Sequence, residues 1–268
     1  METVAIVGVG LIGGSFALAI RKAGFHGRMI GVSSPTAAKA ALDLGVIDEV
    51  RSLEEAAGQA DLIYLAQPIS RILRTIDAIG PHVKLGSLVT DAGSTKRAIC
   101  SRASRSIHNA RFVGAHPMAG KESRGVEHAD AKLFENRPYV VCTRDTELEQ
   151  WIEKIGARLV AMSPATHDRV VALSSHLPQM VSTALASVLG DGPRVSEVAG
   201  PGAIDMTRLA LSSYEIWQDI LSTNAEPIEA ALDVFIRKLE EIRTSLRSPE
   251  MEKEFERAAS AARMIREK

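Results

Sequence analysis

Val4-Ala5-Ile6-Val7-Gly8-Val9-Gly10-Leu11-Ile12-Gly13-Gly14-Ser15 lies close to the start of the chain and is its most informative stretch. The apolar run 4–7 predicts a buried parallel strand, and residues 16–20 continue as an apolar helix. The glycines between them have the spacing G-x-G-x-x-G. The first permits a tight turn, the second lets the backbone approach a pyrophosphate, and the third lets the helix pack closely on the strand. We therefore expect a bound dinucleotide, in contact with Gly8, Gly10, Leu11, Ile12 and Gly13.

The composition is that of a soluble globular protein. Of the 268 residues, 46% are hydrophobic and 24% are charged, which suits one large domain or two smaller ones. The formal net charge of -1 provides no general attraction to nucleic acid or to anionic membranes, so we expect neither partner. Residues 4–20 carry no charge, but their four glycines argue against a signal peptide or a membrane anchor.

The cysteine content indicates the compartment. Cys100 and Cys142 are the two cysteines of the chain, which is too few for a disulfide scaffold, and we expect both to be small buried hydrophobes. Together with the lack of a targeting segment, they predict a cytoplasmic protein. Neither H-E-x-x-H nor a metal-binding Cys/His spacing occurs, so no metal is expected.

The first half of the chain alternates short apolar runs with helical patterns. The expected strands are 3–7, 29–32, 62–66, 88–90, 112–114, 139–143 and 158–161, and the expected helices are 14–23, 36–44, 69–79, 95–104 and 147–155. Such alternation implies right-handed crossovers and a doubly wound parallel sheet, which is an α/β fold.

The pattern changes at Ser163-Pro164. Strand patterns disappear after this point, and helical patterns cover 165–189, 203–211, 214–224 and 226–246, followed by a charged amphipathic tail over 249–268. We therefore expect residues 1–163 to form a dinucleotide-binding domain and residues 164–268 to form an all-helical domain, with a cleft where the two meet.

The end of the second expected strand bears on the choice of cofactor. NAD-binding domains commonly place an acid there for the ribose 2′-OH, whereas this chain has Ser33 and Ser34. A 2′-phosphate would meet no like-charge repulsion, although no arginine follows directly and Lys39 is the nearest cation downstream. The pattern favours NADP over NAD and leaves dual use open. The expected cofactor contacts in this region are Ser33, Ser34, Thr36, Gln67 and Pro68.

Three further segments carry side chains suited to chemistry. They read Thr90-Asp91-Ala-Gly93-Ser94-Thr95-Lys96, Gly114-Ala-His116-Pro117-Met118-Ala-Gly120-Lys121-Glu122 and Ser174-Ser175-His176-Leu-Pro178-Gln179. The first two each follow an expected strand, so they fall on the edge of the sheet where open α/β proteins bind ligands. A histidine there is suited to acid–base chemistry, because its unperturbed pKa lies near neutrality.

The order D-x-G-S-x-K, G-x-H-P-M-A-G and S-H-L-P resembles the prephenate/arogenate (cyclohexadienyl) dehydrogenases of tyrosine biosynthesis. Asp205-Met-Thr-Arg208 and Trp217 extend the resemblance over nearly the whole chain. It implies a Rossmann domain and a helical domain that forms a homodimer. It also implies oxidative decarboxylation of prephenate, arogenate or both, with hydride transfer to NAD or NADP. Some members are fused to a chorismate mutase or to a regulatory domain; the chain ends at Lys268, so we expect neither.

The resemblance also implies roles for individual residues. His116 corresponds to the catalytic histidine that bonds the ring hydroxyl, Ser94 to the serine that orients this hydroxyl, and Arg208 to the arginine that binds a substrate carboxylate. The other expected substrate contacts are His176, Gln179, Glu122 and Trp217. Many relatives that use prephenate have a second histidine where this chain has Gln179, and the neutral amide slightly favours arogenate or the use of both substrates.

Each of these residues also has a structural interpretation. His116 is alternatively a turn residue, His176 a core histidine, Ser94 the N-cap of a helix that begins at Thr95, and Arg208 the partner of Asp205 in a surface ion pair. Asp91 is expected to shape its loop rather than to act as an acid or base. Two other functions stay open, namely an NADP-dependent β-hydroxy acid or imine dehydrogenase and an NADP-binding redox sensor.

Overall fold

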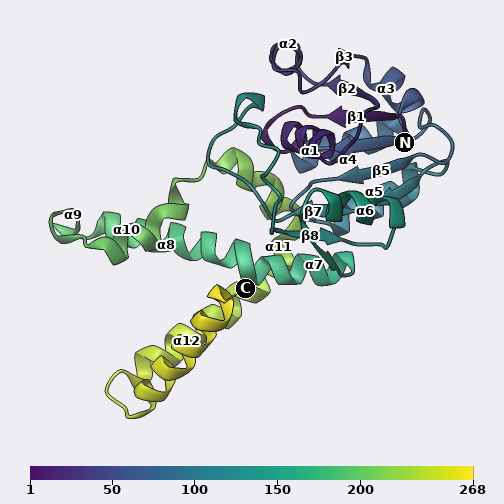
Figure 1. Ribbon diagram of the computed structural model, residues 1–268. Helices are drawn as coiled ribbons and strands as arrows, with labels where there is room; N and C mark the ends of the chain where they lie inside the picture. The colour runs from purple at the N-terminus through teal and green to yellow at the C-terminus, as the bar shows by residue number, and fades with distance from the viewer. Residues whose placement is uncertain (268) are drawn as a thin grey trace.

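The computed structural model describes residues 1–267, and its first part, residues 1–161, is an α/β structure (Figure 1). Its main sheet has the strand order β3-β2-β1-β4-β5-β6, and each neighbouring pair is parallel. These strands are β1 Thr3–Val7, β2 Arg28–Val32, β3 Glu49–Val50, β4 Leu62–Leu65, β5 Leu88–Asp91 and β6 Arg111–Val113. The predicted doubly wound parallel sheet is therefore confirmed.

Helices cover both faces of this sheet. They are α1 Leu11–Lys22, α2 Pro35–Asp43, α3 Leu53–Gln59, α4 Ile69–Ile79, α5 Arg97–Ser106 and α6 Thr146–Lys154. Alternate residues of β1 belong to two different hydrophobic clusters: Ile6 packs with Phe16 of α1, and Val7 packs with Ile72 of α4. This is the pattern of a central strand buried on both faces.

Four elements of the α/β part are absent from the sequence prediction, namely β3, α3, the strand β7 Ala115–Pro117 and the 3-10 helix η1 Val126–His128. The strand β3 has only two residues, which is too short for a periodic signal. The helix α3 begins with a capping box, in which Ser52 and Glu55 each bond the other's main-chain N–H. This signature was available in the sequence, although the alanine-rich interior of α3 provides little hydrophobic periodicity.

The strands expected at 139–143 and 158–161 do not join the main sheet. They form a second sheet of β7 Ala115–Pro117, β8 Pro138–Val141 and β9 Arg158–Ala161, in the order β7-β8-β9. Here β7 runs antiparallel to β8, with His116 opposite Val140. His116 therefore lies in a short strand rather than in the loop predicted for it. Gly114 links the two sheets, where a Cβ would lie 2.4 Å from the Sγ of Cys100.

The cysteines are a second correction. Both Cys100 and Cys142 are half-buried rather than fully buried.

The second part of the chain, residues 164–266, is helical and is called the helical part. Its elements are α7 Pro164–Val171, the π-helix η2 Ala172–His176, α8 Leu177–Asp191, α9 Val195–Val198, α10 Pro201–Thr207, the 3-10 helix η3 Arg208–Leu211, α11 Tyr214–Ser245 and α12 Glu250–Arg266. Lys268, the last residue of the expected tail, lies outside the described residues.

Several helix boundaries differ from the prediction: α9 was not expected, and the helix expected over 203–211 is α10 followed by η3. Proline explains two of the other differences. Pro178 has no N–H to bond the carbonyl of Ser174, and the single helix expected over 165–189 contains the π-helix at this point. In the other case, the helices expected over 214–224 and 226–246 are one helix with a kink at Asn224. Pro227 removes the hydrogen bond to Thr223 there, which is a common cause of kinks.

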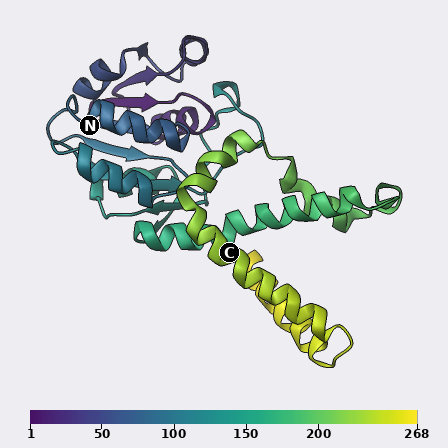
Figure 2. The ribbon, with the colours of Figure 1, turned by 180° about the vertical axis from the view of Figure 1, so that it is seen from behind.

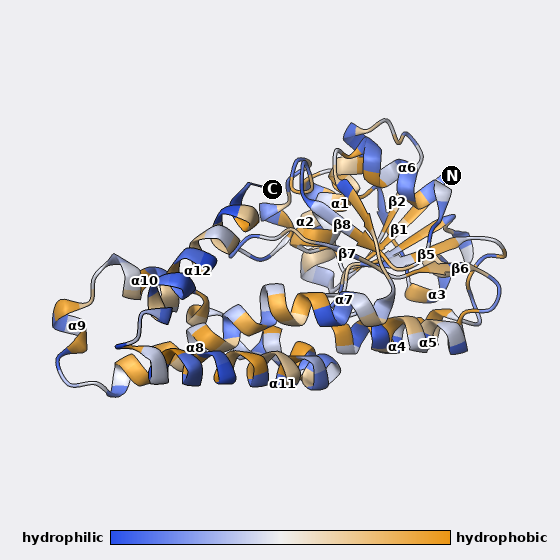
Figure 3. Cartoon of the chain, turned by 90° about the horizontal axis from the view of Figure 1, so that it is seen from below, coloured by the Kyte–Doolittle hydropathy of each residue, from blue (hydrophilic) through white to orange (hydrophobic). Residues whose placement is uncertain are grey.

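The helical part extends away from the sheets as two arms (Figures 1 and 2). One arm consists of α8, α9 and α10, and the other is the hairpin of α11 and α12. Apolar residues recur along these helices (Figure 3), and many of their side chains are exposed, including Val188, Val198, Ile204, Leu211, Ile216, Val234, Leu239, Phe255 and Ile265. Within residues 1–267, no helix is both long enough and apolar enough to cross a membrane.

Candidate active site

The glycine turn lies at the switch point of the main sheet, where β1 and β4 are neighbours. Gly8 has a φ of +95°, and a Cβ there would lie 2.4 Å from the carbonyl oxygen of Ala66. A Cβ on Gly13 would lie 2.2 Å from the carbonyl oxygen of Gly8. These two positions accept only glycine, because the turn and the helix pack directly on the ends of the strands.

Gly10 is different, because a Cβ there would meet no described atom within 4 Å. It is the N-cap of α1, and no described side chain caps the helix. The first N–H groups of α1, including those of Leu11 and Ile12, therefore face open space with the positive end of the helix dipole. This arrangement fits the pyrophosphate of a dinucleotide.

The end of β2 provides hydroxyl groups for the rest of such a ligand. Ser33 is half-buried, and Ser34 and Thr36 are exposed. Ser34 also caps α2, with its Oγ accepting from the N–H of Ala37 at 3.5 Å. Lys39 is paired with Asp43 at 2.7 Å.

The end of β4, beside the glycine turn, carries the other expected cofactor contacts. Gln67 is half-buried and accepts a hydrogen bond from Thr75 at 2.7 Å. Pro68 is exposed and is the N-cap residue of α4.

At the end of β5, Asp91 and Lys96 form an ion pair that is completely buried. Asp91 also accepts hydrogen bonds from the N–H groups of Gly93 at 2.8 Å and Ala115 at 3.1 Å. Lys96 donates to the carbonyl of Ala115 at 2.6 Å. Burial raises the pKa of Asp91, although Lys96 and the two N–H groups oppose the shift. These contacts hold β7 next to β5, so Asp91 shapes the site.

His116 is the half-buried residue in the middle of β7. Its Nδ1 is 2.9 Å from Nε2 of His167, whose Nδ1 is 2.8 Å from Oδ1 of Asp168. Desolvation lowers the pKa of His116 well below its usual value, and the neighbouring His167, Lys96 and His176 lower it further. His116 is therefore a neutral imidazole at physiological pH, and it is the end of a chain of three side chains rather than a lone turn histidine.

Asp168 is fully buried and connects the two parts of the molecule. Its carboxylate accepts from the N–H groups of Lys96 at 2.7 Å and Arg97 at 2.9 Å, and so caps α5 from the helical part. Burial alone would raise the pKa of Asp168, but the hydrogen bonds from His167, Arg97 and Lys96 outweigh it and lower the pKa. Asp168 therefore stays ionised.

Ser94 is half-buried in the loop that leads to α5. That helix begins at Arg97 rather than at Thr95, and Asp168 caps it, so the interpretation of Ser94 as an N-cap is wrong. Ser94 makes no side-chain hydrogen bond to any of residues 1–267, which leaves its hydroxyl free for a ligand.

His176 is buried, with 2% of its surface exposed. Its Nδ1 lies 3.1 Å from Nδ2 of Asn224, and its ring meets that of Trp217 edge to face at 5.8 Å between centroids. Its pKa is lowered to about 4, mainly by desolvation; the charge of Asp168 opposes this shift and His167 adds to it. By its burial, His176 is a core histidine. Its ring also packs against Trp217, which is another of the expected substrate contacts.

Of the remaining expected contacts, Arg208 lies in η3, Gln179 in α8 and Glu122 in the loop between β7 and β8. Arg208 in η3 is 3.5 Å from Glu122, and both side chains are largely exposed, so its partner is Glu122 rather than Asp205. Gln179 is buried, and its amide nitrogen donates to the carbonyl of Leu209 at 2.8 Å and to Thr183 at 3.3 Å. Gln179 therefore holds η3, and with it Arg208, against α8.

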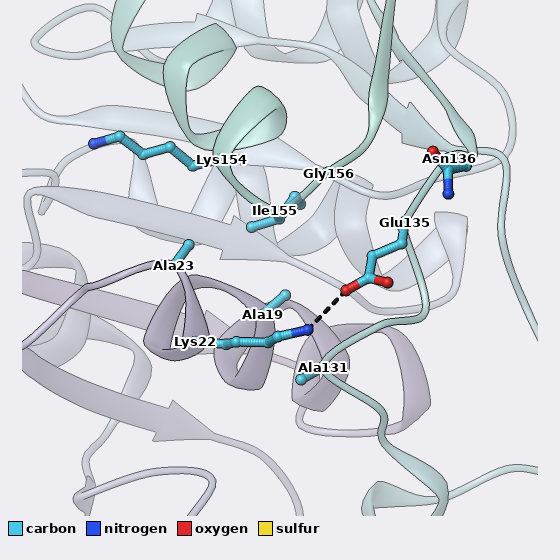
Figure 4. Close-up of a pocket in the computed structure, with 9 residues that line it drawn as sticks. All are labelled: Ala19, Lys22, Ala23, Ala131, Glu135, Asn136, Lys154, Ile155 and Gly156. Carbon is cyan, nitrogen blue, oxygen red and sulfur yellow. Dashed lines mark hydrogen bonds and ion pairs between the residues drawn. The ribbon is translucent and has the colours of Figure 1, made fainter.

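Two hollows of the surface are lined mainly by residues other than the expected site residues. One of about 330 Å³ lies beside α1 (Figure 4), where Lys22 and Glu135 form an ion pair across it at 2.7 Å. Another of about 770 Å³ is lined by residues of α5 and α7, including Arg97 and Cys100. Within residues 1–267, neither is lined by His116, Ser94 or Arg208.

Comparison with known protein families identifies the proteins to which this chain is related. The family model for the nucleotide-binding domain of prephenate dehydrogenase matches residues 16–163, and the model for the dimerization domain of prephenate dehydrogenase matches residues 163–259. The chain belongs to the prephenate dehydrogenase family. It is a dehydrogenase, and the resemblance inferred from the motifs is confirmed.

Individual members of the family are similar over almost the whole chain. The prephenate dehydrogenase of Lactococcus lactis subsp. cremoris is 35% identical over 249 residues, which are 90% of this chain and 70% of the relative. A crystal structure of Aquifex aeolicus prephenate dehydrogenase in complex with hydroxyphenyl propionate and NAD+ has a TM-score of 0.89 at 31% identity and covers 99% of this chain and 97% of its own.

An arogenate dehydrogenase is also similar. The crystal structure of the Synechocystis enzyme has a TM-score of 0.84 at 30% identity, with 99% of each chain covered. The similarities therefore establish the family, which contains relatives named for prephenate and for arogenate.

The sequence prediction missed His167, Asp168 and Asn224. His167 and Asp168 are adjacent polar residues on the buried face of α7, and Asn224 is polar at a buried position of α11. A buried polar residue is the informative exception in such patterns. However, its partners come from other elements and cannot be read from the helix itself.

Proposed function

We propose that this chain catalyses the oxidative decarboxylation of prephenate, arogenate or both, with NAD or NADP as the hydride acceptor. The products are 4-hydroxyphenylpyruvate or tyrosine. The proposal rests mainly on the environment of His116. This residue of β7 is a neutral, half-buried imidazole that is hydrogen-bonded to His167, which in turn is bonded to Asp168. An imidazole of this kind accepts a proton from a hydroxyl.

Each expected residue has a part in this reaction. The ring hydroxyl of the substrate donates a hydrogen bond to His116, with Ser94 orienting it. Arg208 binds a substrate carboxylate through its planar guanidinium, and the exposed pair with Glu122 is weak enough to open for this purpose. His176, Trp217 and Gln179 line the site or support its walls. When bound, the nicotinamide supplies the hydride acceptor.

For the substrate, we favour arogenate or dual use. Prephenate has a keto-acid side chain and is a dianion, whereas arogenate carries an ammonium group. Gln179 is neutral and its amide is already engaged with η3, so it offers no positive charge to a second carboxylate.

For the cofactor, we favour NADP. Ser33, Ser34 and Thr36 place hydroxyls rather than a carboxylate at the end of β2. Arg51 follows β3, and its main-chain N–H donates to the carbonyl of Gly31 in β2, so Arg51 belongs to the segment next to the end of β2. Its present partner is Glu49 at 2.5 Å. An arginine at this position suits a 2′-phosphate.

We also propose that two copies of the chain form a homodimer through the helical part. The family model that matches residues 163–259 describes a dimerization domain, and the arms carry exposed apolar side chains such as Val198, Leu211 and Phe255. Light scattering on the purified chain measures the mass directly, and a monomer at micromolar concentration would contradict this proposal.

One assay grid tests the reaction. Prephenate and arogenate are each offered with NAD and with NADP, and the absorbance of the reduced cofactor is followed. His116→Asn should lower turnover by roughly two to four powers of ten with cofactor affinity unchanged. The matched control is His108→Asn, because His108 is exposed and lies outside the site. Turnover that survives the change at His116 would contradict the proposed mechanism, and a loss with His108→Asn would point to a general effect on folding.

A further inference from the structure

We infer that Asp168 sets opposite tautomers on the two imidazoles of the site, making His116 a hydrogen-bond acceptor at Nε2 and His176 a donor at Nε2. Asp168 does this with two different groups. Its carboxylate acts on His116 through His167, and its main-chain carbonyl acts on His176 through Asn224.

The first branch begins at the carboxylate. An ionised carboxylate only accepts hydrogen bonds, so the Nδ1 of His167 must carry a proton to bond Oδ1 of Asp168 at 2.8 Å. When Nδ1 carries the only ring proton of His167, Nε2 is bare and accepts from Nδ1 of His116 at 2.9 Å. His116 therefore carries its proton on Nδ1 and has a lone pair on Nε2.

The second branch begins at the carbonyl. A main-chain carbonyl also only accepts, so Asn224 must direct its NH₂ group toward the oxygen of Asp168, at 2.9 Å. The same NH₂ group lies 3.1 Å from Nδ1 of His176, which is consequently the accepting nitrogen. Neutral His176 then carries its proton on Nε2.

The buried environment makes these assignments strict. Asp168, His167, His176 and Asn224 are each 2% exposed or less, so water is not available to replace a lost partner, and an unpaired group costs about 1–3 kcal/mol. No described side chain bonds Nε2 of either His116 or His176, so both nitrogens remain free for a ligand. The two rings thus present complementary groups, one accepting and one donating.

This inference deepens the proposed function. A base must offer a lone pair to the substrate hydroxyl. In the Nε2–H tautomer, His116 would direct an N–H group at this hydroxyl and could not accept its proton. His167, Asp168 and Asn224 are therefore positioning residues, which act on the substrate only through the two histidines.

The tautomers themselves are measured without substrate. In protein labelled with ¹⁵N in its histidine rings, long-range ¹H–¹⁵N correlations distinguish protonated from bare ring nitrogens at neutral pH. We expect His116 as the Nδ1–H form and His176 as the Nε2–H form, with assignments from His116→Asn and His176→Gln. Wild-type His116 in the Nε2–H form would overturn the inference, whatever the assay grid shows. An inactive wild-type protein with the expected tautomers would instead contradict the proposed function.

A pair of variants at His167 separates its hydrogen bond from its bulk. His167→Gln retains an oxygen at the ε position that accepts from Nδ1 of His116, whereas His167→Leu has no acceptor. We expect His167→Leu to shift His116 to the Nε2–H form and to lower kcat about 10- to 100-fold, which is part of the 10²–10⁴-fold that a positioned base contributes. The KM should change little, and His167→Gln should restore the tautomer and most of kcat. Equal losses of kcat in both variants with the tautomer unchanged would contradict the inference.

Asp219 provides the matched control for Asp168. It also caps a helix of the α/β part from the helical part, since its carboxylate accepts from the N–H of Ser70 at 2.9 Å, but it bonds no histidine. Asp168→Ala should mix the tautomers of His116, and Asp219→Ala should leave them as in the wild type.

Asn224→Asp tests the second branch. A carboxylate facing Nδ1 of His176 requires a proton on that nitrogen, so His176 should change to the Nδ1–H form. An unchanged His176 in this variant would remove Asn224, and with it the second branch, from the inference.

Discussion

The glycine turn after β1 and the cluster around Asp168 lie at the same edge of the molecule but are built in opposite ways. The turn consists of residues 8–13 and is made almost entirely of backbone, and its fit depends on the absence of side chains at Gly8 and Gly13. The cluster consists of the side chains of Lys96, His116, His167, Asp168, His176 and Asn224, which come from five separate segments of the chain. One half of the site is therefore local in sequence, and the other half exists only after the two parts of the chain have packed together.

The glycine turn and the cluster are stabilised by different interactions. Sterics and the dipole of α1 define the turn, and both are present as soon as β1 and α1 form. Hydrogen bonds between buried polar groups define the cluster, and each depends on a partner from another element. Changes in the turn should consequently act on cofactor binding and local strain, and changes in the cluster should act on stability and proton chemistry.

The largest expected effect is at the buried ion pair of the cluster. Lys96→Met leaves Asp91 buried without its partner and should lower the free energy of unfolding by about 3–5 kcal/mol, as is typical when one half of a buried pair is removed. Lys84→Met is the control, because Lys84 pairs with Asp61 at the surface and its loss should cost about 1 kcal/mol or less. Urea denaturation measures both, and equal effects would contradict the distinction between the cluster and the surface.

The second prediction concerns pH. The pKa of His176 is about 4 in the folded protein, below the value of roughly 6.5 expected when unfolded. As the pH falls, His176 therefore becomes protonated in the unfolded state before it does so in the folded state. The free energy of unfolding consequently decreases as the pH falls from about 6.5 to 4. His176→Gln should remove roughly 3 kcal/mol of this loss. The measurement is the difference in unfolding free energy between wild type and variant at pH 7 and pH 4, and a difference that does not change with pH would contradict the burial of a neutral imidazole.

The third prediction compares two glycines of the turn. Gly8→Ala forces a side chain into positive φ against the carbonyl of Ala66 and should cost about 1–3 kcal/mol of stability without any ligand. Gly10→Ala meets no described atom, so its stability should be unchanged while its dinucleotide affinity falls about tenfold or more, because the methyl group enters the space near α1 that suits a phosphate. Calorimetric unfolding and cofactor titration separate the two, and a Gly10→Ala protein with wild-type affinity would place the pyrophosphate elsewhere.

The smallest expected effect is at the exposed edge of the site. Arg208→Ala should raise the KM of the substrate about tenfold with a smaller change in kcat, as expected when a charge-assisted contact is removed. Glu122→Ala is the companion change, because it removes the partner of Arg208 and leaves the guanidinium in place. An unaltered KM for Arg208→Ala in steady-state assays would remove Arg208 from the substrate site.

Much of the fold was predictable because its signals are short-range. The strand at 3–7, the helix at 69–79 and the strand at 158–161 have the predicted bounds, since period and turn residues specify them locally. The prediction failed where pairing is decided at a distance. The strands near residues 140 and 160 have the same local pattern as those of the main sheet, yet they join β7. The site shows the same limit, because the motif residues Ser94 and His116 were identified but the partners of His116 were not.

The sequence by itself determined the glycine turn, most of the strands and helices of the first half, and the family, because each is encoded by residues close together in the chain or by short motifs. Only the tertiary structure decided what holds His116, which carboxylate caps α5, and which nitrogen of each imidazole carries the proton. The physical reason is that a buried polar group must find its partner wherever packing places one. For Asp168, those partners are the N–H groups of α5 and the ring of His167.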